Sequence, residues 1–223
     1  SIIGLGYVGF PTMLLLSQTK NKIYGYDINF DLINSLKSGK YDKTYSVENN
    51  ISTLYQKQLL NKKLNFNTEL VCSDVYIVCV PTPINRKFKP DTQYVDKAIN
   101  SISKIIKKND LIIIESTVPI NYCDEVRKLL NNYHQNMNFY LAYCPERVLP
   151  GDTLKEIKNN KRIIGGISKH SSNKAKKIYQ SFVNGKIYET TIGISEFTKL
   201  SENAYRDISL NVSRSGGLHL VES

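Results

Sequence analysis

A glycine-rich turn stands between the first apolar stretch of the chain and the first helical pattern. The sequence reads G-L-G-Y-V-G, with glycines at positions 4, 6 and 9, and a second apolar stretch ends in Asp27, eighteen residues beyond Gly9. Glycines at this spacing permit a tight strand-to-helix turn and let backbone N–H groups approach a pyrophosphate closely. The start of the following helix adds partial positive charge there. A turn without a ligand is the alternative, and the order strand, turn, helix, acid favours a dinucleotide site.

Asp27 narrows the choice of dinucleotide. A carboxylate at this position accepts hydrogen bonds from the hydroxyls of an adenosine ribose and repels a 2′-phosphate. The sequence therefore predicts NAD, rather than NADP, as the cofactor.

Apolar stretches alternate with helical patterns from the first residue to about residue 190. The clearest helix is Thr92–Ile106, whose apolar residues share one face and for which Asp91 is a natural N-cap. Nearly continuous apolar strands that alternate with helices are typical of a parallel sheet covered on both faces. We therefore predict an α/β fold with a doubly wound parallel sheet, a Rossmann-type dinucleotide-binding domain. The strands are expected at 1–5, 22–27, 75–80, 111–115, 139–143, 162–165 and 186–189.

Polar residues follow three of these strands directly, in P-T-P (81–83), S-T-V-P (116–119) and C-P-E-R (144–147). In an open parallel sheet, ligands lie outside the carboxyl ends of the strands, so these residues are placed to contact cofactor or substrate. The prolines could equally serve to end their strands. The hydroxyls of Thr82 and Thr117 are better candidates, because each could bond a nicotinamide or a sugar. The residues expected to contact the cofactor are Gly4, Gly6, Tyr7, Val8, Gly9, Asp27, Thr82 and Thr117.

The last helical pattern, from Ser195, separates two kinds of side chain. A helix of this kind either crosses toward a site or a second domain, or is a plain amphipathic surface helix. We expect Gly216 and Gly217 to end it. One face, expected to be buried, holds Phe197, Leu200, Ala204 and Ile208; the other, polar, holds Glu196, Lys199, Asn203 and Arg206.

Composition argues against several other functions. The formal charge is +10, but the lysines are spread through the chain and form no basic stripe, so nucleic-acid binding is a distant alternative. No apolar run has the length of a membrane span, and no signal sequence is recognised. The cysteines and histidines lack the spacing of a metal site, and Cys72 and Cys79 resemble small buried apolar residues. We expect a cytoplasmic protein with reduced thiols.

Several motifs, taken in order, resemble the UDP-glucose/GDP-mannose dehydrogenase family over residues 2 to about 210. They are G-L-G-Y-V-G-F-P, V-P-T-P-I-N, P-D-T-Q-Y-V, E-S-T-V-P, Y-C-P-E-R-V-L-P-G, K-R-I-I-G-G and K-L-S-E-N-A-Y-R-D. The P-E-R-V-L-P-G form, followed by K-R-I-I-G-G, is most similar to the UDP-N-acetyl-D-mannosamine dehydrogenases. UDP-glucose enzymes carry a P-E-F-L-x-E-G type of loop, and this chain has Pro150 in place of its second glutamate.

The resemblance implies NAD-dependent oxidation of a UDP-sugar at C6, from alcohol to carboxylate, in two hydride transfers through a cysteine-bound thioester. It implies that Lys199 and Asn203 stabilise charged intermediates and contact the substrate. Thr117 would position a catalytic water, and Glu146 would act in acid–base chemistry. Arg147, Val148 and Leu149 would line the substrate.

The family's nucleophilic cysteine belongs to a G-x-G-G-x-C motif that does not occur in this chain. Cys144 matches a family position of little chemical consequence, and we expect it to be structural. We expect an NAD-binding domain at 1–190, the start of a connecting helix at 191–212 and an atypical tail at 213–223, with the UDP-binding domain lost through truncation or a changed reading frame. The family implies a homodimer for the full-length protein.

Two further interpretations remain open. One is a different sugar specificity within the family, for UDP-glucose or UDP-N-acetylglucosamine. The other is a non-catalytic NAD-binding module.

Overall fold

The structure is a computed structural model that describes residues 1–40, 48–85, 89–135, 137–148 and 151–219, with side chains as far as residue 209. Within these residues the strands form one eight-stranded sheet in the order β3-β2-β1-β4-β5-β6-β7-β8. The first six strands of this order are mutually parallel. They are β1 (Ile2–Ile3), β2 (Tyr24–Tyr26), β3 (Asn65–Asn67), β4 (Val75–Val78), β5 (Leu111–Ile114) and β6 (Tyr140–Tyr143), followed by β7 (Arg162–Gly166) and β8 (Ile187–Thr191).

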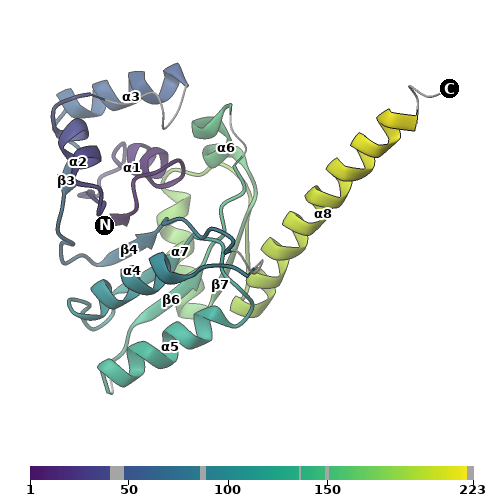
Figure 1. Cartoon of the computed structure of the whole chain (residues 1–223). Helices are drawn as coiled ribbons and strands as arrows, with labels where there is room; N and C mark the ends of the chain where they lie inside the picture. Colours follow the sequence, from purple (N-terminus) through teal and green to yellow (C-terminus); the bar gives the residue numbers. More distant parts are fainter. Residues whose placement is uncertain (41–47, 86–88, 136, 149–150, 220–223) are drawn as a thin grey trace.

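Helices cover both faces of this sheet (Figure 1). One face packs against α1 (Gly9–Leu16), α2 (Phe30–Lys37), α3 (Asn49–Leu60), α6 (Thr153–Asn159) and α7 (Lys169–Gln180). The other packs against α4 (Gln93–Ser103), α5 (Tyr122–Tyr133) and the first turn of α8 (Ile192–His219). The doubly wound α/β fold is thus confirmed.

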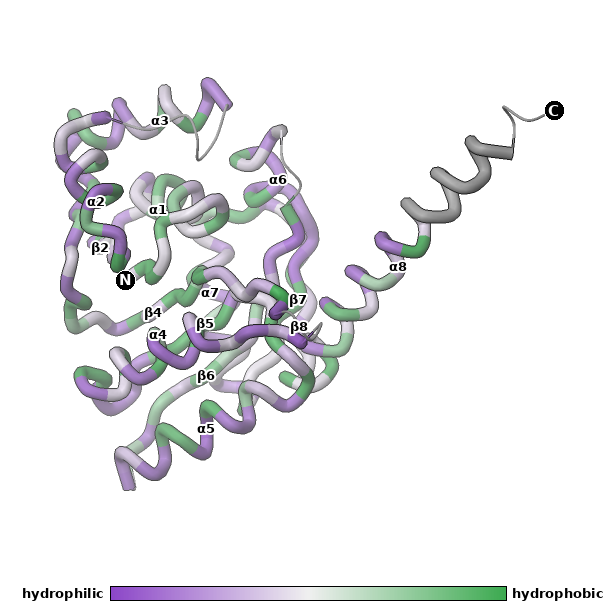
Figure 2. Tube along the Cα trace, in the orientation of Figure 1, coloured by the Kyte–Doolittle hydropathy of each residue, from purple (hydrophilic) through white to green (hydrophobic). Residues whose placement is uncertain are grey.

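The two hydrophobic cores arise from the alternation of side chains along each strand. Ile2, Ile77 and Ile113 belong to the first core, and their neighbours Ile3, Val78 and Ile114 belong to the second. Hydrophobic residues accordingly gather along the strands and α1, while hydrophilic residues mark the outer faces of the covering helices (Figure 2).

The sheet is mostly parallel, as predicted, but it departs from the parallel arrangement at β7. This strand pairs with β6 in the antiparallel sense, with Tyr143 opposite Gly165, and β8 runs parallel to β7. The intervening α6 has seven residues, about 10 Å of helix, so β7 starts near the edge where β6 ends. Continuing the same register three residues beyond β6 sets Arg162 opposite Glu146. The sequence also did not predict β3, which has only three residues.

The predicted burial of the last helix is inverted. Phe197 and Ile208 are exposed by 60% and 64%, and Ala204 is also exposed, whereas Glu196 and Lys199 are buried at 0% and 8%. The reason is that Glu196 accepts hydrogen bonds from the backbone N–H groups of Asn121 and Cys123 at 2.8 and 2.9 Å, at the first turn of α5. The polar face of α8 therefore packs on the domain.

The end of α8 also differs from expectation. The helix continues through Gly216 and Gly217 to His219, although we expected these glycines to end it. Figure 1 shows α8 packed on the body only at its first turns and then extending away from it. None of the helices in the described ranges combines the length and the apolar character needed to cross a membrane.

Candidate active site

The glycine-rich turn has the geometry of a cofactor cradle. Gly4 has a φ of +89°, which side chains disfavour, and a Cβ on Gly9 would lie 1.8 Å from the carbonyl oxygen of Gly4. These two glycines therefore allow the strand and helix to meet closely. Gly6 differs, because a Cβ there would meet no atom within 4 Å. Its open side faces the cleft described next.

A cleft of about 700 Å³ opens at the carboxyl ends of β1 and β4, where the strand order reverses. Such switch points are where open α/β sheets bind ligands. The cleft collects most of the residues singled out in the sequence. Those that line it are Gly4, Gly6, Tyr7, Val8, Asp27, Thr82, Thr117, Glu146, Val148 and Lys199.

Asp27 closes one end of the cleft. Its carboxylate accepts hydrogen bonds from the backbone N–H groups of Leu5 and Asn29, both at 2.8 Å. A carboxylate offers about four acceptor positions, so two remain for ribose hydroxyls. The apolar side chains of Ile28 and Leu32 line the same end, beside the space a nucleoside would occupy.

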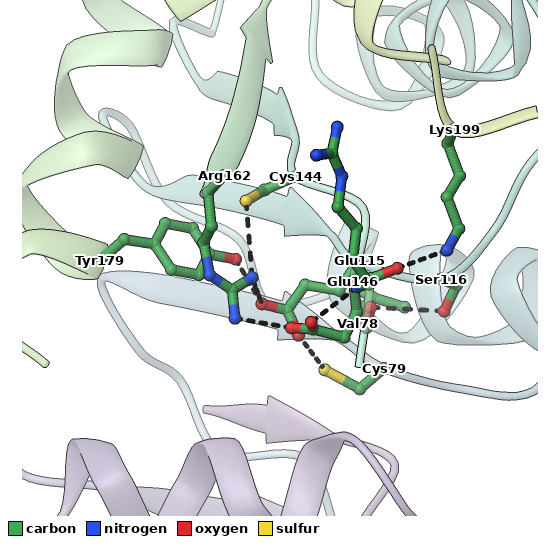
Figure 3. Close-up of polar contacts among 10 residues, drawn as sticks. Val78, Cys79, Glu115, Ser116, Cys144, Glu146, Arg162, Tyr179 and Lys199 are labelled. Carbon is green, nitrogen blue, oxygen red and sulfur yellow. Dashed lines mark hydrogen bonds and ion pairs between the residues drawn. The ribbon is translucent and has the colours of Figure 1, made fainter. Parts of the chain in front are cut away.

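Glu146 lies at the other end, in a buried polar cluster (Figure 3). Its carboxylate accepts from Arg162 Nη2 at 2.6 Å and from the N–H of Arg147 at 2.7 Å. Arg162 also lies 3.5 Å from the carboxylate of Glu115, which accepts from Tyr179 at 2.6 Å and from Cys79 at 3.1 Å. One guanidinium thus serves two carboxylates.

The sequence did not predict a role for Glu115, Arg162 or Tyr179. Both E-S-T-V-P and K-R-I-I-G-G were noted as motifs, but their charged residues are far apart in the chain. Only the antiparallel register of β7 sets Arg162 against Glu146. Cys79, expected to be an apolar residue, donates to a carboxylate, and Cys72 is exposed.

Burial shifts the pKa values of the ionisable side chains in and around this cluster. Burial raises the pKa of Glu115, with Arg162 opposing the shift and Glu146 adding to it. Burial, with the Arg206 guanidinium nearby, lowers the pKa of Lys199. Cys144 is fully buried, and burial raises the pKa of its thiol to about 12. A thiol so protonated and enclosed makes a poor nucleophile, in agreement with the structural role expected for it.

Lys199 reaches the site from α8. Its ammonium donates to the main-chain oxygen of Glu146, and its side chain lines the cleft. Glu196, one turn earlier, fixes the rotation of α8 through its bonds to α5. Glu146, Lys199 and Thr117 therefore line the same cleft.

Three predicted site residues do not line the cleft. Gly9 packs under the turn, and Asn203 is half-buried on α8 but does not line the cleft. Arg147 turns to Glu202, with Nη2 2.7 Å from the carboxylate, and borders a second hollow of about 760 Å³ along α8. Leu149 lies outside the described residues.

These features fit NAD. The open side of Gly6, the start of α1 and the spare acceptor positions of Asp27 match a pyrophosphate and an adenosine ribose. Among the residues that the structure describes, no group of three or more His, Cys, Asp or Glu side chains could hold a metal ion. Fold and site together define a dinucleotide-binding domain with a charged cluster at one end of its cleft.

Comparison with known proteins identifies the family. The model of the UDP-glucose/GDP-mannose dehydrogenase family, NAD binding domain, matches residues 1–183. The chain belongs to this family, and the predicted cofactor, NAD, is confirmed at the level of the family domain.

Its relatives are nucleotide-sugar dehydrogenases. It is 41% identical over 213 residues to UDP-N-acetyl-D-mannosamine dehydrogenase of Methanococcus maripaludis, covering 94% of this chain and 48% of that protein. The UDP-N-acetyl-mannosamine dehydrogenase of Staphylococcus aureus is 37% identical with a TM-score of 0.86, covering 93% of this chain and 51% of that one. The UDP-D-ManNAc dehydrogenase of Pyrococcus horikoshii is 36% identical with a TM-score of 0.87, covering 93% and 50%. The chain thus spans about half the length of these relatives.

Proposed function

We propose that this chain is the NAD-binding half of a UDP-sugar 6-dehydrogenase, with UDP-N-acetyl-D-mannosamine as its substrate. The observation that carries the proposal is the convergence of Glu146, Lys199 and Thr117 on the cleft whose opposite end holds the glycine turn and Asp27. Three relatives at 36% to 41% identity are dehydrogenases of this sugar, which supports the choice.

The chemistry follows from the positions of the charged groups. Bound NAD supplies a hydride acceptor. Lys199 is buried, and among the described residues its ammonium bonds a main-chain oxygen and forms no ion pair, so it can stabilise negative charge that develops on a substrate oxygen. Arg162 and the N–H of Arg147 hold Glu146 in one orientation, in which its carboxylate can accept a proton from water. The Thr117 hydroxyl can position that water.

A cysteine-bound thioester requires a reactive thiol, which we expect from the half of a family-length protein that this chain does not span. Cys144 is not that thiol, because it is enclosed beneath the cluster. In the proposed arrangement residues 1–190 bind NAD, α8 connects the two halves, and Asn203 and Arg147 meet the substrate from the α8 side. We expect the full-length assembly to be a homodimer.

The first test is binding of NAD and NADP to this chain by calorimetry. NAD should bind, and NADP should bind at least about tenfold more weakly, since repulsion of the 2′-phosphate by Asp27 is worth more than 1 kcal/mol. The second test joins this chain to the C-terminal half of the Methanococcus maripaludis relative and follows NADH absorbance with a panel of UDP-sugars.

The joined protein should form NADH with UDP-N-acetyl-D-mannosamine, and Glu146→Gln should lose that activity while still binding NAD. Faster turnover of UDP-glucose or UDP-N-acetylglucosamine would refute the proposed substrate. NAD binding without turnover of any sugar, in a folded joined protein, would instead support a non-catalytic NAD-binding module.

A further inference from the structure

A hydrogen-bonded chain joins the cofactor turn to the start of α6. Thr153, the first residue of α6, is fully buried, and its hydroxyl lies 2.7 Å from the hydroxyl of Tyr7 and 2.6 Å from a carboxylate oxygen of Glu48. Thr153 lies 146 positions from Tyr7 and 105 positions from Glu48 in the sequence. Tyr7 belongs to the glycine-rich turn and lines the cleft. The contact thus links the cofactor site to a segment far along the chain.

The direction of the bonds follows from proton count. A threonine hydroxyl has one proton, and an ionised carboxylate can only accept. Thr153 therefore donates to Glu48, and Tyr7 donates to Thr153. Burial raises the pKa of Tyr7, which keeps the phenol protonated as a donor. The relay runs from Tyr7 through Thr153 to Glu48.

The carboxylate of Glu48 also bonds backbone groups of the same segment. It accepts from the backbone N–H of Thr153 at 2.8 Å and from that of Gly151 at 3.2 Å. Glu48 is the N-cap residue of α3 but makes no capping bond to that helix, and Asp152 makes none to α6. Glu48 thus supplies, from a distance, the acceptor that the first turn of α6 needs.

The described residues between Glu146 and Thr153 are therefore anchored on both sides. On one side, Glu146 and Arg147 are held by Arg162 and Glu202. On the other, Gly151 and Thr153 are held by Glu48 and, through Thr153, by Tyr7. Glu146 and Val148 line the cleft between these anchors.

We propose that Tyr7 is a positioning residue that couples occupancy of the cofactor turn to the placement of Gly151 and Thr153 at the start of α6, through Thr153 and Glu48. A ligand that fixes the glycine turn fixes Tyr7, and the relay then holds the start of α6. Coupling of this kind is reciprocal, so a substrate that fixes the start of α6 also strengthens NAD binding. This second consequence rests on the proposed function, whereas the coupling itself needs only NAD.

Amide hydrogen exchange measured by NMR tests the coupling on this chain. The amides of residues 151 and 153 are followed with and without saturating NAD, whose affinity is measured by calorimetry for every variant. In the unaltered chain, NAD should slow exchange at both amides by about fivefold, the factor expected for one net hydrogen bond.

Thr153→Val removes the hydroxyl, keeps the side-chain shape and leaves the backbone N–H in place. The NAD-induced slowing should then fall below about twofold, and Tyr7→Phe should have the same effect. Thr12→Val is the matched control, because Thr12 is also fully buried but its hydroxyl has no hydrogen-bond partner among the residues that the structure describes. It should keep the full slowing. Glu48→Gln should speed exchange at both amides even without NAD.

Three results would overturn the coupling. The first is that NAD binds but does not slow exchange at either amide of the unaltered chain. The second is that NAD still slows exchange fully in Thr153→Val and Tyr7→Phe. The third is that Thr12→Val loses the NAD-induced slowing as much as Thr153→Val does. If the unaltered chain does not bind NAD at all, the proposed function fails as well. Measuring affinity and exchange separately distinguishes these cases.

Discussion

Adding one methyl group should lower the stability of the fold at Gly9 but leave it nearly unchanged at Gly6, although both glycines belong to the same turn. In Gly9→Ala the new Cβ would lie 1.8 Å from the carbonyl oxygen of Gly4, so backbone atoms must move by more than 1 Å. Overpacking of this kind costs about 3 kcal/mol, or about 10 °C in melting temperature for a chain of this size. In Gly6→Ala the Cβ meets no atom within 4 Å, so stability should change by less than about 0.5 kcal/mol.

NAD binding should separate the two variants further. The space beside Gly6 belongs to the cleft, so the methyl group takes volume that a pyrophosphate needs. If the same overpacking penalty acts in the NAD-bound state, the affinity for NAD falls by about 100-fold. Gly6→Ala should therefore melt like the unaltered chain but bind NAD poorly.

The assay pairs thermal unfolding, followed by circular dichroism, with NAD calorimetry on both variants. A Gly6→Ala variant that binds NAD normally would show that the pyrophosphate lies elsewhere. A Gly9→Ala variant of normal stability would show that the turn can relax, and would remove the physical basis for assigning Gly9 a packing role.

Three further predictions concern single charged groups. Asp27→Ser should lower the affinity for NAD by about tenfold and reduce the preference for NAD over NADP, because it removes the charge that bonds the ribose. Calorimetry with both dinucleotides measures this. Glu196→Ala should lower the free energy of unfolding in urea by about 3 kcal/mol, because two backbone N–H groups at α5 lose their acceptor. Because burial lowers the pKa of Lys199, this side chain binds fewer protons in the folded than in the unfolded chain as pH nears 10.5. It therefore adds a rising contribution to the free energy of unfolding there, and Lys199→Met should lack that contribution.

Each of these three predictions has a control variant or a result that would contradict it. Glu125→Ala alters an exposed acid in the first turn of α5 and should change stability by less than about 0.5 kcal/mol. Equal losses in Glu125→Ala and Glu196→Ala would mean that the capping bonds contribute little. An unchanged NADP affinity in Asp27→Ser would argue against its role at the ribose. Parallel pH profiles for the unaltered chain and Lys199→Met would contradict the inferred burial of the ammonium.

The last helix shows where sequence periodicity misleads. The spacing of Phe197, Ala204 and Ile208 correctly predicts a helix with two faces, but periodicity states only that the faces differ. Which face is buried depends on what the helix packs against. Here the partner is the first turn of α5, whose unpaired N–H groups bond a carboxylate, so Glu196 is buried and the apolar residues are exposed.

The sequence alone determined the alternation of strands and helices, the glycine turn, Asp27 and the family, because each depends on residues close together in the chain. The tertiary structure decided what depends on distant pairs. The antiparallel register of β7 brings Arg162 to Glu146, and the packing of α6 beside α1 brings Thr153 to Tyr7. Side-chain periodicity shows which face of an element is apolar, but partners arise only when the elements pack, so these contacts could not be read from the chain.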